Sequence, residues 1–375
     1  MLKKFSNLAP EVRQYMLVTG NYWAFTLTDG ALRMLVVLYF YSLGYSPLEI
    51  AMLFIFYEMF GVITNLFGGW LGARLGLNKT MNIGLFIQIL ALGMLLVPSS
   101  LLSIPCVMAA QALSGIAKDL NKMSAKRAIK TLVPSDAQSQ LYKWVAILTG
   151  SKNALKGAGF FLGGLLLSLL GFHGAVLSMA LALSVIWVFS VLTLGKDLGK
   201  AKNKPKFREI FSKSKAINTL SAARLFLFGA RDVWFVIAIP VYFASTLSWS
   251  HVSIGTFMAC WIIGYGIIQS IAPRLTSRNS DEITSQVPDG RDATIWSIPL
   301  ALIPAAIAFG LYLGWSPTFV LVPGLLLFGG LFAINSSLHS YLIVSYAQDD
   351  GVSLDVGFYY MANAMGRLLG TVLSG

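Results

Sequence analysis

The chain of 375 residues is 56% hydrophobic and only 12% charged, with a mean hydropathy of +0.70. Soluble domains carry about 25% charged residues, so this composition excludes an ordinary soluble globular protein. The net charge of +12 does not indicate a nucleic-acid-binding protein, because most of the basic residues fall in polar breaks between long apolar segments.

Apolar runs of about 20 residues recur from Tyr15 onwards, and each is long enough to cross a hydrocarbon core about 30 Å thick. A β-barrel would need shorter, alternating segments. We predict helices at 13–42, 48–72, 80–98, 102–125, 140–170, 173–195, 216–246, 251–275, 293–313, 318–345 and 354–375. The fold class is therefore that of an all-α polytopic membrane protein.

The lysines and arginines of the predicted loops fall on one side of the membrane. That side carries Arg74, Lys79, Lys126, Arg127, Lys130, Arg274, Arg278, Arg291 and eight more between 196 and 215. The loops of the other side, at 44–47, 98–103, 171–174, 245–250 and 314–317, contain neither residue type. Because basic loops remain in the cytoplasm, we expect the N-terminus to be cytoplasmic and the protein to lie in the inner cell membrane.

A basic segment, KDLGKAKNKPKFREIFSKSK at 196–215, divides the chain. It separates a predicted six-helix bundle at 1–195 from an incomplete bundle, helices 7 to 11, at 216–375. Two bundles joined by a basic cytoplasmic linker resemble the plan of the major facilitator superfamily, in which the halves are parallel repeats. Relative to that plan, a twelfth helix is missing from this sequence.

A weak internal repeat is consistent with two related halves. The sequence LYFYS at 38–42 resembles VYFAS at 241–245, and this register aligns Asp29 with Asp232. Chance similarity between apolar helices is the alternative.

A glycine-rich sequence follows the second predicted helix. Gly69, Arg74 and Gly76 match the superfamily's cytoplasmic G-x-x-x-D-R-x-G turn, but Ala73 replaces the aspartate. Glycine permits tight turning, so these three residues are candidates for a conformational turn. A simple glycine-rich turn is the alternative.

Two pairs of glycines have the small-xxx-small spacing that lets helix backbones approach closely. They are Gly159 with Gly163, and Gly366 with Gly370. We interpret both pairs as ordinary helix packing.

Leaving aside residues at the helix ends, eight basic side chains, but only four acidic ones, lie inside the hydrophobic segments. Charges at such positions usually face a cavity, so the positive surplus predicts an anionic cargo. Guanidinium groups bind oxyanions bidentately, and lysine adds a point charge. The candidate substrate-binding residues are Arg33, Lys152, Lys156, Arg224, Arg231 and Arg367, with Asn21 and Asn153 as polar additions that also suit helix packing. Lys118 and Lys122 lie toward the cytoplasmic end, where snorkelling is an equal alternative.

The acidic residues are candidates for proton coupling or ion pairing: Asp29, Glu58, Asp119 and Asp232. Asp29 and Arg33 are four residues apart and share a helix face, which predicts an internal ion pair. Glu58 is alone in its helix, where burial disfavours its charged form. Pairing between helices is the structural alternative to an anion site, but four acids do not neutralise eight bases.

Nothing in the sequence indicates an enzyme or a metal centre. Cys106 and Cys260 both lie in apolar runs and form no CxxC motif. His173 and His251 fall in outer loops, and His339 stands alone in the tenth helix. We therefore predict no catalytic residue, no metal and no cofactor.

Several runs are similar to the ArsJ family of organoarsenical efflux permeases, which belong to the major facilitator superfamily. They are GNYWAFTLTDGALRMLVVLYF (20–40), YSPLEIAMLF (45–54), ALSGIAKDLNKMSAKRAIK (112–130), LTGSKNALKGAGFFLGG (148–164) and LSAARLFLFGARDVWFVIAIPVY (220–242). The resemblance covers essentially the whole chain.

This resemblance implies export of 1-arseno-3-phosphoglycerate and hence arsenate resistance. Glyceraldehyde-3-phosphate dehydrogenase would supply that cargo by using arsenate in place of phosphate, without physical contact. The expected partners are thus an anionic small molecule, the lipid bilayer and this enzyme, and the expected state is a monomer. The alternatives are an organophosphate–phosphate antiporter and a proton-coupled exporter of other small anions.

Overall fold

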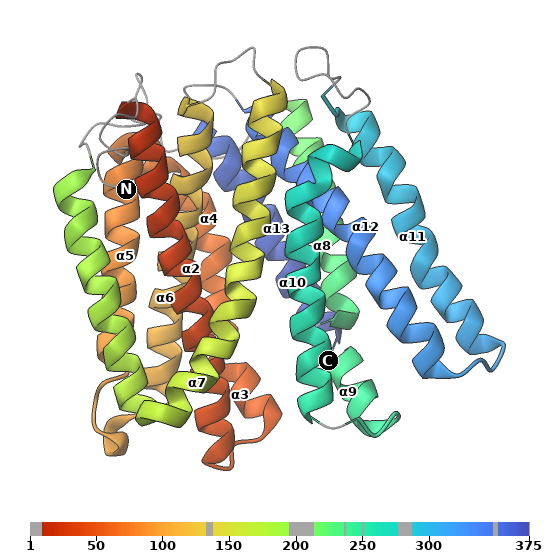
Figure 1. Cartoon of the computed structure of the whole chain (residues 1–375), viewed down its shortest axis with the longest axis horizontal. Helices are drawn as coiled ribbons and strands as arrows, with labels where there is room; N and C mark the ends of the chain where they lie inside the picture. Colours follow the sequence, from red (N-terminus) through yellow and green to blue (C-terminus); the bar gives the residue numbers. More distant parts are fainter. Residues whose placement is uncertain are drawn as a thin grey trace.

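The structure is a computed structural model that describes residues 10–132, 138–194, 214–235, 238–249, 251–276, 287–347 and 352–374. Long helices run side by side through the molecule, and the N and C marks lie toward opposite edges of the bundle (Figure 1). All regular secondary structure in the described residues is helical. This confirms the predicted fold class. Most of the basic linker, and Arg278, lie outside the described residues.

The first half of the chain forms α2 (Pro10–Ser42), α3 (Pro47–Leu53), α4 (Ile55–Leu75), α5 (Leu77–Met94), a short 3-10 turn (Ser99–Leu101), α6 (Ile104–Leu132) and α7 (Gln138–Thr193). α7 contains two of the predicted helices, which are continuous except for a change of direction at Gly171. The φ of Gly171 is 65°, a left-handed conformation that glycine adopts without strain.

The second half forms α8 (Lys215–Phe235), α9 (Ala238–Ser245), α10 (His251–Thr276), α11 (Gly290–Tyr312), α12 (Pro317–Tyr346) and α13 (Val352–Ser374). α8 and α9 together occupy the predicted helix at 216–246, and the other bounds agree within a few residues.

Three details differ from the sequence prediction. The single helix predicted at 48–72 is divided into α3 and α4 at Phe54. α6 continues to Leu132 rather than ending at 125, so Lys126 belongs to a helix and not to a loop. The turn between α4 and α5 consists of Gly76 alone, whose φ is 89°. Gly69 and Arg74 therefore lie within α4, where the Arg74 guanidinium packs over the Trp70 ring at 4.9 Å.

Close backbone contacts join α2 to α7 and α8 to α13. A Cβ added at Gly163 would overlap the carbonyl oxygen of Ala31, and one at Gly366 would overlap that of Leu225. A Cβ at Gly159 would lie 2.6 Å from the Leu27 carbonyl oxygen. The glycine pairs therefore act in helix packing, as predicted.

The two halves meet chiefly where α4 packs on α13 and where α7 packs on α10. Near the beginning of α7, Tyr142 Oη and Thr276 Oγ1 are 2.9 Å apart, and Tyr341 Oη donates to Gln138 Oε1 at 3.2 Å. Further along α7, a Cβ at Gly150 would overlap Ser270 of α10. These contacts close the halves together at one end of the bundle, the upper edge in Figure 1. We refer to it as the linker end, because α7 ends there at Thr193 and α8 begins there at Lys215, the two helix ends that flank the linker in sequence.

Five helices of the described chain are long and apolar enough to cross a membrane by length and composition: Arg13–Ser42, Gln138–Thr193, Thr256–Thr276, Gly290–Tyr312 and Pro317–Tyr346. α6 and α8 do not meet this criterion because polar and charged residues interrupt their apolar faces. These same two helices supply many of the charges considered next.

Candidate anion-binding site

An ion-paired cluster occupies the contact between the two halves. Glu58 of α4 accepts from Arg33 of α2 at 3.2 Å and from Arg367 of α13 at 2.8 Å, both through Oε1. The three side chains keep exposed fractions of 26% for Arg33, 19% for Glu58 and 27% for Arg367. The expectation that Glu58 is an isolated carboxyl group is wrong, because two arginines from neighbouring helices neutralise it.

The cluster extends to α8 through Arg367. The Nε of Arg367 donates to Asp232 Oδ2 at 3.3 Å, and Arg231 pairs with the other oxygen of the same carboxylate at 2.5 Å. The side chain of Asp232 is 1% exposed, so its charge is buried and compensated by two guanidinium groups. The chain Arg33–Glu58–Arg367–Asp232–Arg231, which we call the arginine chain, links the two halves.

The expected Asp29–Arg33 ion pair does not form. Both carboxylate oxygens of Asp29 accept from the hydroxyl of Tyr57, at 2.8 and 3.0 Å. Arg33 instead reaches α4, where its guanidinium carbon also lies 4.8 Å from the Tyr57 ring centre. The tertiary partner on α4 is better placed than the residue one helical turn away.

Asp119 holds two lysines of its own helix, α6. Lys122 Nζ lies 2.5 Å from its Oδ1, and Lys118 Nζ lies 3.9 Å from its Oδ2. Each lysine also packs on a tyrosine ring, with Lys118 3.9 Å from the Tyr57 centre. Both side chains are less than one fifth exposed and point into the protein, which disfavours the snorkelling interpretation.

Lys152 and Lys156 of α7 have no acidic partner within ion-pair distance in the described part of the chain. Lys152 interacts electrostatically with Lys122, Arg367 and Lys118. Lys156 interacts with Arg33, Arg367 and Lys152, and Asp29 attracts both lysines over a longer distance. These two ammonium groups thus bring α7 into the positive region around the arginine chain.

Arg224 of α8 forms no ion pair with the arginine chain, although its guanidinium and that of Arg231 pack on the same Phe228 ring, at 3.9 and 4.6 Å. Its Nε donates to Asn363 Oδ1 at 2.8 Å and its Nη1 to Ser336 Oγ at 3.1 Å, both neutral acceptors. Lys126 of α6 donates to Thr149 Oγ1 at 2.7 Å and interacts electrostatically with Arg224. The sequence analysis placed Lys126 in a loop and so left it out of the candidate site. In the structure it lies within α6, six residues before the end of the helix.

The two asparagines have partners in neighbouring helices. Asn21 donates to Ser190 Oγ at 2.8 Å on the second part of α7, within the first half of the chain. Asn153 donates to Gln269 Oε1 at 2.7 Å, across the contact between α7 and α10. Asn21 is therefore a packing residue in this structure, and Asn153 lies next to the basic residues.

The charge count of the region follows from these contacts. The basic residues are Arg33, Lys118, Lys122, Lys126, Lys152, Lys156, Arg224, Arg231 and Arg367. The acidic residues are Asp29, Glu58, Asp119 and Asp232. Among the described residues, Lys126, Lys152, Lys156 and Arg224 form no ion pair. Such an excess of positive charge suits an anionic ligand. No group of three metal-ligating side chains occurs in the same residues.

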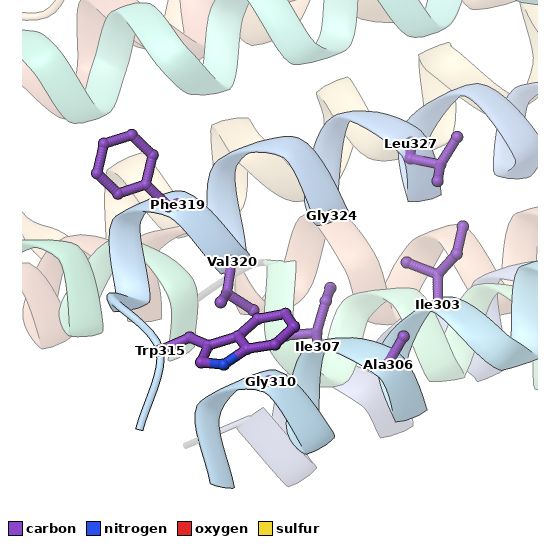
Figure 2. Close-up of a pocket in the computed structure, with 9 residues that line it drawn as sticks. All are labelled: Ile303, Ala306, Ile307, Gly310, Trp315, Phe319, Val320, Gly324 and Leu327. Carbon is purple, nitrogen blue, oxygen red and sulfur yellow. The ribbon is translucent and has the colours of Figure 1, made fainter. Parts of the chain in front are cut away.

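A separate pocket of about 250 Å³ lies between α11 and α12 (Figure 2). Apolar and aromatic side chains line it, including Ile303, Ile307, Trp315 and Phe319. The pocket differs chemically from the basic region, because none of its lining residues is charged.

Comparison with known proteins identifies the architecture. The sequence profile of the Major Facilitator Superfamily matches residues 18–371. The fold is similar to the proton:xylose symporter XylE bound to 6-bromo-6-deoxy-D-glucose, with a TM-score of 0.73 at 12% identity, covering 96% of this chain and 88% of that one.

Two further structures are similar. One is a bacterial homologue of the iron transporter ferroportin in an outward-facing state with soaked iron (TM-score 0.70, 13% identity, covering 96% of this chain and 90% of that one). The other is the fucose:proton symporter FucP of E. coli (TM-score 0.69, 11% identity, covering 97% of each chain). At these identities the likeness concerns the fold alone. A search of curated protein sequences gave no match.

The profile match spans nearly the whole chain, and the solved structures extend over both halves. The membership excludes an enzymatic role and accounts for the long apolar helices and the two packed halves. The chain is therefore a multi-pass membrane protein and a secondary active transporter that belongs to the Major Facilitator Superfamily.

Proposed function

We propose that the protein exports a small organic anion with more than one negative charge. The observation that carries this proposal is the excess of partly buried positive charge between the helices. Lys152 and Lys156 have no acidic partner among the described residues, and the fields of Arg33, Arg367 and Lys122 reinforce theirs. Unpaired charges in a membrane protein are costly, so a site of this kind is retained for the ligand that neutralises it.

The cargo that fits this site and the ArsJ resemblance is 1-arseno-3-phosphoglycerate. It bears a phosphate at one end and an acyl arsenate at the other, and both are oxyanions that arginine and lysine bind well. Glyceraldehyde-3-phosphate dehydrogenase would supply it in the cytoplasm. Arg33, Arg231 and Arg367 offer guanidinium groups, and Lys152 and Lys156 offer point charges.

The orientation proposed from the basic loops gives the direction of transport. With the N-terminus in the cytoplasm of an inner membrane, the linker end faces inwards. The inside-negative potential then assists the exit of anions by about 2.3 kcal/mol per charge for each 100 mV. Asp29 and Asp232 are the acids proposed for coupling to protons. Gly76 is proposed as the conformational turn, with Gly69 and Arg74 in the last turns of α4 before it.

Transport into everted membrane vesicles tests the proposal. Arsenic accumulation is compared between arsenate alone and arsenate with the dehydrogenase, NAD and glyceraldehyde-3-phosphate. Accumulation that requires the complete mixture supports the organoarsenical cargo. Accumulation with arsenate alone would make the protein an inorganic oxyanion carrier, and acceleration by phosphate on the opposite side would identify an organophosphate–phosphate antiporter.

The variant Lys152→Gln should lower the initial rate at least about tenfold, because it removes a charge that no protein acid neutralises. Lys79→Gln is the matched control, since Lys79 is an exposed lysine of α5 outside the basic region. Equal rates for the two variants would remove Lys152 from the anion site.

A further inference from the structure

Two buried cations, one from each half of the chain, lie on the linker-end side of the arginine chain. Arg224 and Lys126 are each 3% exposed, and their charges interact. Their hydrogen-bond partners, Asn363, Ser336 and Thr149, are all neutral. Two like charges buried together without an acid are unfavourable, and a bound anion would compensate both.

Several hydrogen-bond donors around Arg224 share one hydroxyl acceptor among the described residues, beside the amide oxygen of Asn363 and a long contact of 3.4 Å to the Ser336 carbonyl oxygen. The hydroxyl oxygen of Ser336 accepts from Arg224 at 3.1 Å, from Tyr265 at 2.8 Å and from Gln269 at 3.2 Å. A hydroxyl has two lone pairs, so three donors exceed its capacity. The excess shows that donors converge here around too few acceptor atoms.

Two more buried polar atoms beside this group have no hydrogen-bond partner among the residues that the structure describes. They are the hydroxyl of Tyr359, whose ring centre is 5.3 Å from the Arg224 guanidinium carbon, and Nδ1 of His339, on which the charge of Arg224 acts. The residues are 0% and 6% exposed. Buried polar groups of native proteins are normally satisfied, so both atoms are available to a ligand.

We infer that Arg224, Lys126 and Tyr359 form a second oxyanion subsite, which binds one terminal phosphate-like group of the cargo. This subsite rests on the proposed function, because it assumes that the cargo carries an oxyanion at its end. Arg224 supplies a guanidinium fork, Lys126 a point charge and Tyr359 a hydroxyl donor. Ser336 and His339 complete the surroundings.

The position of the subsite defines when it is accessible. Arg224 lies two helical turns closer to the beginning of α8 than Arg231 does, and Lys126 lies in the last turns of α6. The subsite is thus between the arginine chain and the closed linker end. Lys126 belongs to the first half, whereas Arg224, Ser336 and Tyr359 belong to the second, so parting of the halves at this end opens the subsite. It would then receive the cargo first when the transporter faces the linker side.

Binding to the purified protein in nanodiscs tests the subsite without any transport measurement. Inorganic phosphate is titrated by calorimetry into the unmodified protein and the variants Lys126→Gln, Tyr359→Phe and Lys79→Gln. We expect Lys126→Gln and Tyr359→Phe to weaken phosphate binding about tenfold, the usual effect of removing a hydrogen bond to a charged group, and Lys79→Gln to leave it unchanged. Tyr359→Phe removes one oxygen atom only, so its result stands if Lys126→Gln does not fold.

Binding of phosphate that is equal in all four proteins, or absent from the unmodified protein, would overturn the subsite. A second arm uses propane-1,3-diphosphonate, a short molecule with an oxyanion at each end. If the subsite holds one end of the cargo, this probe binds more tightly than phosphate and loses affinity with Lys126→Gln and also with Lys152→Gln. An affinity equal to that of phosphate and insensitive to Lys152→Gln would overturn the assignment to a cargo end. Phosphate binding that depends on Lys126 would survive a failure of organoarsenical transport, which separates the two proposals.

Discussion

Neutralising Glu58 should shift the protein away from the conformation described here. Glu58 Oε1 accepts from Arg33 at 3.2 Å and from Arg367 at 2.8 Å. The contact with Arg33 lies within the first half, so it is expected to persist when the halves move. Of the two contacts of Glu58, only the one with Arg367 joins the halves. Glu58→Gln weakens it in the present conformation, and it is expected to be absent once the halves have moved apart.

The size of the shift follows from this single contact. A hydrogen bond to a charged group contributes about 1.5–3 kcal/mol, and we take the lower end because the side chains of Glu58 and Arg367 are 19% and 27% exposed. About 1.5 kcal/mol corresponds to roughly a tenfold change in the ratio of two conformations. Arg367 keeps its contact with Asp232, so the protein should remain folded.

Distances between spin labels at the linker end measure the ratio. Labels are attached through Lys143→Cys of α7 and Leu275→Cys of α10, both exposed, after Cys106 and Cys260 have been replaced by serine. We expect Glu58→Gln to increase the fraction of long distances. Glu49→Gln is the control, because Glu49 is an exposed carboxylate that bonds only to Ser46 within its own turn. Identical distance distributions for the two variants would refute a role of the arginine chain in holding the halves together.

Two further changes test other parts of the structure. Gly163→Ala should destabilise the protein by about 1–3 kcal/mol, because the new methyl group overlaps the Ala31 carbonyl oxygen. Gly20→Ala is the control and should not destabilise it, because no atom lies within 4 Å of the new methyl group. Equal melting temperatures of the two purified variants would contradict the close packing of α2 on α7. Asp29→Asn should strengthen binding of inorganic phosphate severalfold, because it removes the negative charge that attracts Lys152 and Lys156. Calorimetry would show the opposite change if Asp29 only positions Tyr57.

The helices were predictable because the thickness of a bilayer fixes the length of an apolar span. The change of direction at Gly171 was predicted as a loop between two helices, since glycine marked it. The extension of α6 to Leu132 was not predicted, because Lys126, Arg127 and Lys130 have the composition of a loop although the helix continues through them. Charge in a sequence does not reveal whether a side chain faces a cytoplasmic solution or a neighbouring helix.

The site shows a similar division. Sequence identified the basic and acidic residues that the arginine chain contains, because buried charges in a membrane protein are rare. It paired them incorrectly, since spacing along one helix joins Asp29 to Arg33, whereas the fold gives Arg33 to Glu58 and Asp29 to Tyr57. Neutral residues such as Ser336 and Tyr359 carried no signal, because hydroxyl groups are common in helices without any ligand.

Gly150 belongs to the contacts that close the linker end, and the chemistry of these contacts determines how closure responds to salt. At the linker end, contacts between α7, α10 and α12 include glycine backbone against α10 and hydroxyl and amide groups, such as Tyr142 with Thr276 and Tyr341 with Gln138. Dissolved salt does not weaken neutral contacts of this kind, whereas it weakens the attraction of the partly exposed charges further inside for an anion that approaches from solution. A rise in ionic strength should therefore lower the affinity for the proposed anionic cargo without opening the closed linker end. Substrate affinity and closure of the linker end thus respond to different properties of the surrounding solution.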